Sequence, residues 1–413
     1  MTKKSDAPAI RFKGFSDAWE QRKLGEVGTT YTGLSGKTKE DFGHGNGQFV
    51  TYMNVFSNPV GLPDMTEAVE IDDSQNKVLF GDVLFTTSSE TPEEVGMSSV
   101  WLENAENTYL NSFCFGYRPT VEFNPYYLAY MLRSSSMRKK ITFLAQGISR
   151  YNISKNKMMD IEIPIPKIEE QKQIGSYFRN LDNLITLHQR KFEKLTNVKK
   201  SMLEKMFPQN GSSYPEIRFK GFTDPWEQRK AVDIADYSKG NGYSKSDLTE
   251  NGTPIILYGR LYTKYQFAID EVDTFATPKD GSIYSQGNEV IIPASGETAE
   301  DIARASAVEK SGILLGGDLN ILRPFNFINP LFLALTISNG EPQKELAKKA
   351  QGKSVVHIHN SDIQEVTVSF PTRAEQDRIV AVFRSLDNLI TLHQRELEKL
   401  QNIKKSMLEK MFV

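Results

Sequence analysis

Apolar residues recur at alternating steps of four and three between positions 174 and 206. This spacing is a heptad seam, which is typical of a long helix that packs along one stripe of its surface. Pro166 stands just before the segment and Pro208 just after it, as expected where a helix begins and ends. The pattern predicts one helix over residues 169–207, and its return from position 379 to position 411 predicts a second over residues 374–412.

The two predicted helices belong to an internal repeat. They are identical at 28 of 39 positions, and residues 10–23 return almost unchanged as residues 217–230. Shorter matches between these blocks keep an offset of 205 to 207 residues, so we expect two halves with one fold. Because residues 217–226 follow the first helix closely, residues 10–19 should lie near the end of the second. The segments between the blocks have diverged much further, which predicts one symmetric scaffold with two specificities.

The divergent segments predict an α+β fold. Short apolar runs next to glycine, such as residues 78–80, indicate strands. Alternation with period two predicts a strand directly before each long helix, over residues 161–165 and 366–370. Asn-Pro pairs begin two predicted helices, over residues 125–141 and 330–349.

We therefore expect two pseudo-symmetric domains of mixed strands and helices, separated by two long antiparallel coiled-coil helices. The antiparallel direction follows because two equal copies related by a closed two-fold axis pack in opposite directions. The predicted segments are residues 1–166 for the first domain, 167–209 for the first spacer helix, 210–371 for the second domain and 372–413 for the second spacer helix.

Two sets of residues on the predicted helices indicate how the helices align and where a further subunit binds. His188 and Lys199 interrupt the first seam, and His393 and Lys404 interrupt the second at matching places. Such polar residues usually set register. Apolar residues beside the seam would be exposed in a two-stranded coil, which favours docking of a further subunit over packing on the arms. These candidate docking residues are Leu184, Leu187, Val198, Leu203, Leu389, Leu392, Ile403 and Leu408.

Composition narrows the environment of the chain. Among 413 residues there is no apolar run of about 18, the length that a membrane span requires, and the mean hydropathy is −0.44. The single cysteine, Cys114, excludes an internal disulfide and a cysteine-rich zinc site, so we expect a cytoplasmic protein. The net charge of −2 divides into −3 and −5 on the arms and +4 and +2 on the helices. Any contact with DNA must therefore be local or shared with a partner.

The sequence offers no catalytic or metal-binding constellation. The segment from Gly33 to Thr38 partly matches a phosphate-binding loop, but Tyr31 occupies the position of the first glycine. Asn124-Pro125-Tyr126-Tyr127 is similar to a methyltransferase loop, yet a helix start explains it better. His357 and His359 alternate on a predicted strand, but no third ligand is evident. A binding subunit is the best interpretation.

The junction of arm and helix carries a family resemblance. The pattern Pro-x(3)-Glu-Gln-x(2)-Ile, followed by Leu-Asp, occurs at the start of both helices and follows a Gln-Gly pair in each arm. Its residues are Gln146, Gly147, Pro166, Glu170, Gln171, Ile174, Leu181 and Asp182, and then Gln351, Gly352, Pro371, Glu375, Gln376, Ile379, Leu386 and Asp387. Nearly the whole chain resembles the specificity (S) subunit of type I restriction-modification systems. It departs at Ser369 and at Arg373-Ala374, which replace a proline and Ile168-Glu169.

The resemblance implies that each arm is a target recognition domain that reads one half of a bipartite site in double-stranded DNA. It implies that the helices set the gap between the half-sites. Two methyltransferase (M) subunits would dock on the chain and methylate adenine with S-adenosylmethionine, and two restriction (R) subunits would use ATP and Mg²⁺. The S subunit itself would hold no cofactor. From the residues alone, a non-catalytic protein–protein scaffold with two arms remains the alternative.

Polar residues in the loops of each arm are the candidate DNA contacts, since base edges and phosphates are read by such side chains. In the first arm they are Ser35, Lys37, Lys39, Ser88, Ser89, Glu90, Thr91, Arg150 and Tyr151. In the second arm they are Tyr243, Lys245, Arg260, Tyr262, Lys264, Ser295, Glu297, Thr298, Lys353 and His357. Replacing Lys37 or Lys245 should weaken DNA binding and reduce its salt dependence.

Overall fold

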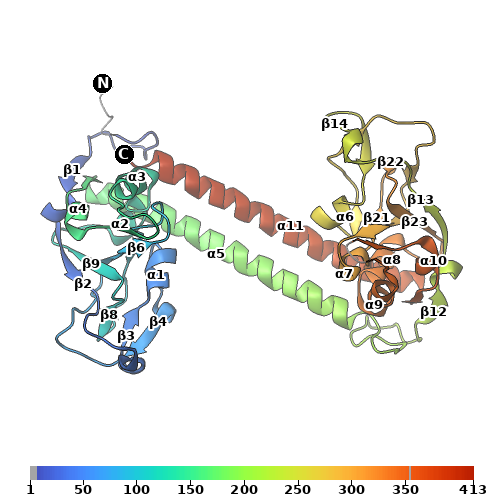
Figure 1. Ribbon diagram of the computed structural model, residues 1–413, viewed down its shortest axis with the longest axis horizontal. Helices are drawn as coiled ribbons and strands as arrows, with labels where there is room; N and C mark the ends of the chain where they lie inside the picture. Colours follow the sequence, from blue (N-terminus) through green and yellow to red (C-terminus); the bar gives the residue numbers. More distant parts are fainter. Residues whose placement is uncertain (1–6, 353–354) are drawn as a thin grey trace. The chain divides into compact units, whose positions relative to one another are not determined.

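The computed structural model describes residues 7–352 and 355–413 and divides into two compact units (Figure 1). Unit 1 comprises Met1–Arg190 and Gln394–Val413, and unit 2 comprises Lys191–His393. Each unit therefore contains one arm, one half of the first long helix and one half of the second.

Both long helices are present. Helix α5 spans Ile168–Lys205 and α11 spans Arg373–Lys410, which confirms the two predicted helices. In unit 1 the ring of Phe178 stacks on Phe412 at 5.6 Å, and Asp182 pairs with Lys404 at 2.5 Å. Residue numbers rise along α5 as they fall along α11, so the helix halves pack antiparallel within this unit.

Unit 1 contains a four-stranded antiparallel sheet and a three-stranded mixed sheet. The first has the order β2 (Gly28–Thr32), β9 (Cys114–Pro119), β5 (Val83–Thr86) and β7 (Ser98–Val100). The second has the order β4 (Thr66–Val69), β3 (Phe42–Val50) and β8 (Thr108–Leu110). The helices of this arm are α1 (Tyr52–Ser57), α2 (Pro125–Met131), α3 (Ser135–Phe143) and α4 (Lys155–Met159).

Unit 2 has two five-stranded sheets. One has the order β13 (Ala235–Lys239), β23 (Leu319–Pro324), β19 (Glu289–Pro293), β21 (Ser306–Val308) and β16 (Ala268–Ile269). The other has the order β14 (Leu248–Thr249), β17 (Phe275–Ala276), β15 (Thr253–Ile256), β22 (Ser311–Leu315) and β18 (Tyr284–Gln286). The helices of this arm are α6 (Arg260–Thr263), α7 (Ala299–Ile302), α8 (Pro330–Ile337), α9 (Gly340–Lys349) and α10 (Asn360–Gln364).

A two-stranded ribbon leads into each long helix, and the ribbon has the same geometry in both units. Strand β1 (Glu20–Lys23) pairs antiparallel with β11 (Glu162–Ile165) before α5. Strand β12 (Glu227–Lys230) pairs antiparallel with β25 (Thr367–Phe370) before α11. The predicted strands before the helices are thereby confirmed, and the α+β fold occurs twice.

A buried carboxylate holds the repeated segment 10–23 against the start of α5. Glu170, whose side chain is 1% exposed, accepts two hydrogen bonds from Arg11 at 2.7 and 2.8 Å and one from the Trp19 indole at 3.1 Å. Charge-assisted bidentate pairs of this kind fix geometry strongly. In unit 2, Arg218 and Glu375 form the same bidentate pair at 2.8 Å.

The same segment also closes the end of the other helix. The Ile10 amide donates to the Lys410 carbonyl at 2.9 Å, and the Ile217 amide donates to the Lys205 carbonyl at 2.9 Å. These bonds satisfy carbonyls that a helix end otherwise leaves free. They confirm that the segment beginning at Ile10 lies near the end of the second helix.

Three predicted elements differ in the structure. The helices predicted over residues 125–141 and 330–349 are each broken into two, α2 and α3 in unit 1 and α8 and α9 in unit 2. Ser134 caps α3 by accepting from the Met137 amide, and Gly340 adopts a φ of +66° that a helix does not continue through. The strand predicted at residues 78–80 was wrong, because this segment is a loop.

Candidate nucleic-acid interface

A short ribbon gathers several of the candidate DNA contacts in unit 1. Strand β6 (Ser88–Ser89) pairs antiparallel with β10 (Tyr151–Asn152), so that Tyr151 lies opposite Ser89. Gln146 and Asn152 exchange two backbone hydrogen bonds of 3.0 and 2.8 Å, which close residues 147–151 into an exposed hairpin tip. The tip carries the exposed candidate Arg150, and the loop after β6 carries Glu90 and Thr91, which are also exposed.

Unit 2 repeats this ribbon with different side chains. Strand β20 (Ser295–Gly296) pairs with β24 (Val356–His357), and Ser295 Oγ lies 3.1 Å from His357 Nδ1. Gln351 and His357 exchange hydrogen bonds of 3.2 and 2.8 Å, which close the second hairpin. The exposed candidates Glu297 and Thr298 follow β20, and Thr298 caps α7 by accepting from the Asp301 amide. Lys353 lies outside the described residues.

Glycine is required at the base of both tips. Gly147 has a φ of +147° and Gly352 a φ of +146°. A Cβ at these positions would lie 2.0 Å from the Arg150 carbonyl oxygen and 1.8 Å from the Val355 carbonyl oxygen. No other residue fits so close a backbone approach. The two Gln-Gly pairs therefore preserve a hairpin backbone whose tip residues differ between the units.

A tyrosine supports each ribbon from a neighbouring helix. Tyr52 of α1 donates to the Ser88 carbonyl at 2.7 Å, and the candidate Tyr262 of α6 donates to the Ser295 carbonyl at 2.7 Å. Tyr262 therefore positions the ribbon through its hydroxyl group. Sequence reasoning missed Tyr52, because its spacing from Tyr262 is 210 residues and falls outside the offset of the other matches.

Several of the candidate DNA contacts are buried or already paired within the fold. Ser88 and Ser89 are 4% and 9% exposed because they lie within the ribbon, and Tyr243 is 8% exposed in a small apolar cluster. The Lys37 side chain is 13% exposed and pairs with Asp72 at 2.9 Å, which raises the pKa of the lysine. Distant segments supply these partners, so local polarity did not reveal them.

The remaining candidates are not part of the two ribbons. In unit 1, Ser35 and Lys39 are exposed, and the Ser35 amide donates to Gln75 at 3.0 Å. In unit 2, Arg260 pairs with Asp273 at 2.8 Å and Lys264 pairs with the same carboxylate. The Arg260 side chain is only 11% exposed.

Lys245 is exposed in unit 2, and its replacement tests a phosphate contact. We expect Lys245→Ala to weaken binding to duplex DNA and to reduce the slope of log K against log salt concentration by about 1, the value for one lost phosphate contact. Fluorescence anisotropy at several salt concentrations measures this slope. Lys37→Ala is the matched control and should leave the slope unchanged, because Lys37 is paired with Asp72. An unchanged slope in Lys245→Ala would exclude the contact.

The candidate docking residues on the long helices fall into two groups. Five are at least 38% exposed, namely Leu184, Leu187, Val198, Leu389 and Leu392. The other three, Leu203, Ile403 and Leu408, are partly buried against the cores of the arms. These three were wrongly grouped with the exposed face, because the arms cover the ends of the helices.

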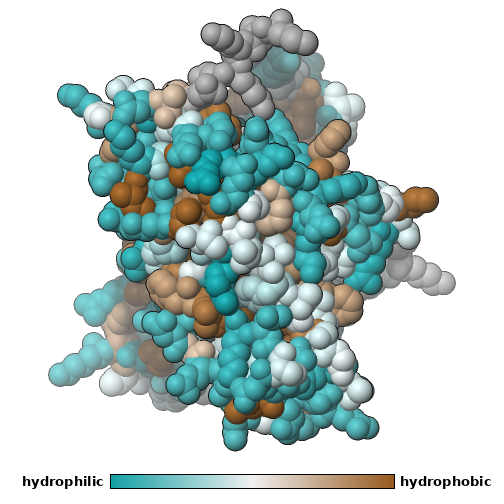
Figure 2. All heavy atoms as spheres, turned by 90° about the vertical axis from the view of Figure 1, so that its left-hand side faces the viewer, coloured by the Kyte–Doolittle hydropathy of each residue, from teal (hydrophilic) through white to brown (hydrophobic). Residues whose placement is uncertain are grey.

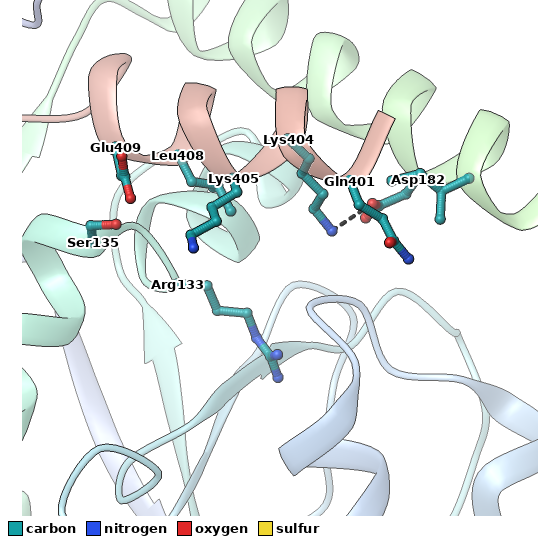
Figure 3. Close-up of a pocket in the computed structure, with 9 residues that line it drawn as sticks. Arg133, Ser135, Asp182, Gln401, Lys404, Lys405, Leu408 and Glu409 are labelled. Carbon is teal, nitrogen blue, oxygen red and sulfur yellow. Dashed lines mark ion pairs between the residues drawn. The ribbon is translucent and has the colours of Figure 1, made fainter. Parts of the chain in front are cut away.

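The lysines in the helix seams form ion pairs. Lys404 reaches Asp182 in unit 1 at 2.5 Å, and Figure 3 shows the two side chains pointing toward one another. Lys199 reaches Asp387 in unit 2 at 2.6 Å. Because these pairs join equivalent positions of α5 and α11, they specify one helix register in each unit.

Arg133 lies beside the first of these pairs, in a cavity of about 450 Å³ between α5, α11 and the start of α3. Its guanidinium donates to the carbonyls of Ser98, Val55, Phe56 and Asn58. Burial lowers the pKa of this guanidinium to about 10, so it stays charged at neutral pH. Arg133 therefore ties the end of α1 to β7.

Other residues with reactive or metal-binding chemistry have structural positions. Cys114 is buried in β9, and burial raises the pKa of its thiol. His357 lies on β24 but His359 caps the start of α10, so the two do not share a strand as predicted. In residues 7–352 and 355–413, His, Cys, Asp and Glu form no group of three placed to hold a metal ion. No helix in this part of the chain is long and apolar enough to cross a membrane.

Comparison with known protein families shows the family to which the chain belongs. The family described as "Type I restriction modification DNA specificity domain" matches the chain twice, over residues 16–197 and 223–402. The chain belongs to this type I DNA specificity family. Each matched region contains one arm and most of one long helix, which agrees with the internal repeat.

Individual relatives in the specificity family extend over much of the chain. The type I restriction enzyme MjaVIII specificity subunit of Methanocaldococcus jannaschii is 25% identical over 288 residues, which are 66% of this chain and 67% of that protein. The putative type I restriction enzyme MjaX specificity subunit of the same organism is 23% identical over 412 residues, 94% of this chain and 92% of that protein.

Solved structures confirm the fold of this specificity-family member. The S subunit of a type I restriction-modification system from M. genitalium has a TM-score of 0.62 at 14% identity, over 98% of this chain and 99% of that one. A chain from a structure that concerns complex assembly and conformational transition of the type I system has a TM-score of 0.50 at 18% identity, over 94% and 96%.

Proposed function

We propose that this chain is the DNA-recognition subunit of a type I restriction-modification complex and that each unit reads one half of a bipartite site. The observation that carries the proposal is the duplicated hairpin. The backbone hydrogen bonds and the positive-φ glycine are the same in both units, whereas the tip and ribbon residues differ. A hairpin with the same backbone but different side chains in the two units suits the recognition of two different half-sites.

The partners in this proposal supply the chemistry. Two methyltransferase subunits with S-adenosylmethionine would bind the exposed leucines of α5 and α11, such as Leu184 and Leu389, which are 43% and 40% exposed. Apolar side chains exposed at helical spacing favour contact with another helical surface. Two restriction subunits with ATP and Mg²⁺ would complete the complex. The chain itself contributes recognition and the spacing between the half-sites.

Mapping of DNA methylation tests the function directly. The chain is co-expressed with its methyltransferase subunit, and methylated adenines are located across a bacterial genome by single-molecule sequencing. We expect one bipartite motif with a constant gap. Methylation without such a motif would contradict the proposal, and assembly with the methyltransferase without DNA recognition would favour the two-armed protein scaffold.

A further inference from the structure

The hairpin tip of unit 1 presents an unusually exposed apolar side chain. Ile148 is 95% exposed at the tip, and Phe143, at the end of α3 just before the hairpin, is 88% exposed. Isoleucine and phenylalanine are normally among the most buried residue types. Figure 2 shows a mostly hydrophilic face of unit 1, on which hydrophobic residues form small separate groups.

Backbone and ring contacts join this tip to Phe113, which is 55% exposed. The Ile153 amide donates to the Thr87 carbonyl at 3.0 Å, and the Thr87 amide donates to the Phe113 carbonyl at 2.9 Å. The guanidinium of Arg150 lies over the Phe113 ring, 5.7 Å from its centroid. The hairpin therefore has an apolar residue at its tip, with an aromatic ring and a cation beside it.

Unit 2 has polar residues at the equivalent places. The Ile358 amide donates to the Ala294 carbonyl at 3.1 Å and the Ala294 amide donates to the Asp318 carbonyl at 2.9 Å, so Asp318 occupies the position of Phe113. The residue that corresponds to Phe143 by the offset of 205 is Lys348, near the end of α9. At these two positions the apolar side chains belong to unit 1 alone, although Val355 in the hairpin of unit 2 is 47% exposed.

The dimensions of DNA restrict what such a tip can contact. The major groove is about 12 Å wide and admits a two-stranded ribbon, whereas the minor groove is only about 6 Å wide. Along the base edges of the major groove, the C5-methyl group of thymine is the apolar group, and the other exposed groups are hydrogen-bond donors and acceptors. An isoleucine carried into this groove is complementary to thymine.

We propose that Ile148 of unit 1 recognises the C5-methyl group of a thymine in the half-site of this unit, with Arg150 beside it on the phosphate backbone. The inference rests on the proposed function and adds a base and a residue to it. Unit 2 carries Asp318 and Lys348 at the positions of Phe113 and Phe143, so the proposal concerns the half-site of unit 1 alone.

The test is a cycle that combines one protein change with one DNA change. The complex of the full chain with its methyltransferase subunit carries Ile148→Ser, and each thymine of the mapped motif is replaced in turn by deoxyuridine, which lacks the methyl group. We expect Ile148→Ser to weaken binding about four- to fifteenfold on thymine DNA, as for loss of one or two buried methyl groups. At one thymine, deoxyuridine should weaken wild-type binding similarly and leave Ile148→Ser unchanged.

The matched control is Val121→Ser. Val121 is 39% exposed on the same unit and lies after β9, whereas Phe113 lies before this strand. Its replacement should therefore leave DNA affinity unchanged. Equal losses from Ile148→Ser on thymine and deoxyuridine DNA, or no loss at all, would overturn the inference while the bipartite motif stands. Absence of thymine from both half-sites would overturn it as well. If no bipartite motif is found, the proposed function fails first.

Discussion

Residues 1–209, expressed without the second half, should form a stable homodimer. In the full chain, unit 1 is completed by Met411 and Phe412, which directly follow α11 and are buried in the core of this unit. Met206 and Phe207 directly follow α5 at the equivalent positions. A second copy of the half-chain can therefore supply the missing helix end, and each copy does this for the other, as in a closed two-fold dimer.

The ion pairs of the seam can also form between two copies of the half-chain. Lys404 pairs with Asp182 in unit 1, and Lys199 of a second half-chain would take the place of Lys404 because the two lysines are equivalent in the repeat. Size-exclusion chromatography with light scattering should give about the mass of the full chain. With the half-chain, the methyltransferase subunit should methylate a palindromic motif built from the half-site of unit 1.

Phe207→Ala is the informative variant of the half-chain. Phe412 stacks on Phe178 at 5.6 Å and lies 5.9 Å from Tyr127, and Phe207 would take this place in the homodimer. Truncation of a buried phenylalanine costs about 3–5 kcal/mol, enough to weaken dimerisation by more than a hundredfold. Exposed Leu187→Ala should leave the dimer intact. A monomeric, folded wild-type half-chain would contradict the exchange of helix ends.

Glu170→Ala should strongly destabilise unit 1. The carboxylate is buried and accepts from Arg11 twice and from Trp19 once, so its removal leaves a largely buried guanidinium and an indole N–H without their acceptor. Breaking one partner of a buried ion pair costs about 3–5 kcal/mol. Urea denaturation followed by Trp fluorescence measures the free energy of unfolding.

Glu375→Ala is the matched change in unit 2. Glu375 holds Arg218 in the same bidentate way, but the buried Trp226 indole N–H has no hydrogen-bond partner among the described residues. The loss should therefore be smaller than for Glu170→Ala by about 1 kcal/mol, the net value of one hydrogen bond. A stability loss below about 1 kcal/mol in Glu170→Ala would contradict a structural role of the pair.

The relation between sequence and structure differs between the scaffold and the candidate interface. The heptad seam, the repeat and the period-two strands before each helix located α5, α11, β11 and β25 within one or two residues. These elements are regular, and one stripe or face of each is apolar, so local periodicity is enough to define them. The breaks at Ser134 and at Gly340 were missed because each lies inside a segment that is helical on both sides.

The DNA-contact candidates were harder to predict for a physical reason. Polar loop residues look alike in sequence, whether their partner is water or a distant segment. Lys37 and Lys245 were equivalent candidates, but only the fold places Asp72 against Lys37. The exposure of Ile148 could not be predicted, because an isoleucine in a loop carries no local signal that distinguishes an exposed position from a buried one.

The sequence by itself determined that this protein is one α+β unit with a long helix, made twice, with divergent segments between nearly identical blocks. Repetition and periodicity are properties of residue order, so they can be read without coordinates. Only the tertiary structure decided that the seam lysines pair with Asp182 and Asp387, that Ser88 and Tyr243 are buried, and that Ile148 is exposed at the tip of a hairpin. Burial and pairing depend on residues that are far apart in the sequence and become neighbours only when the chain folds.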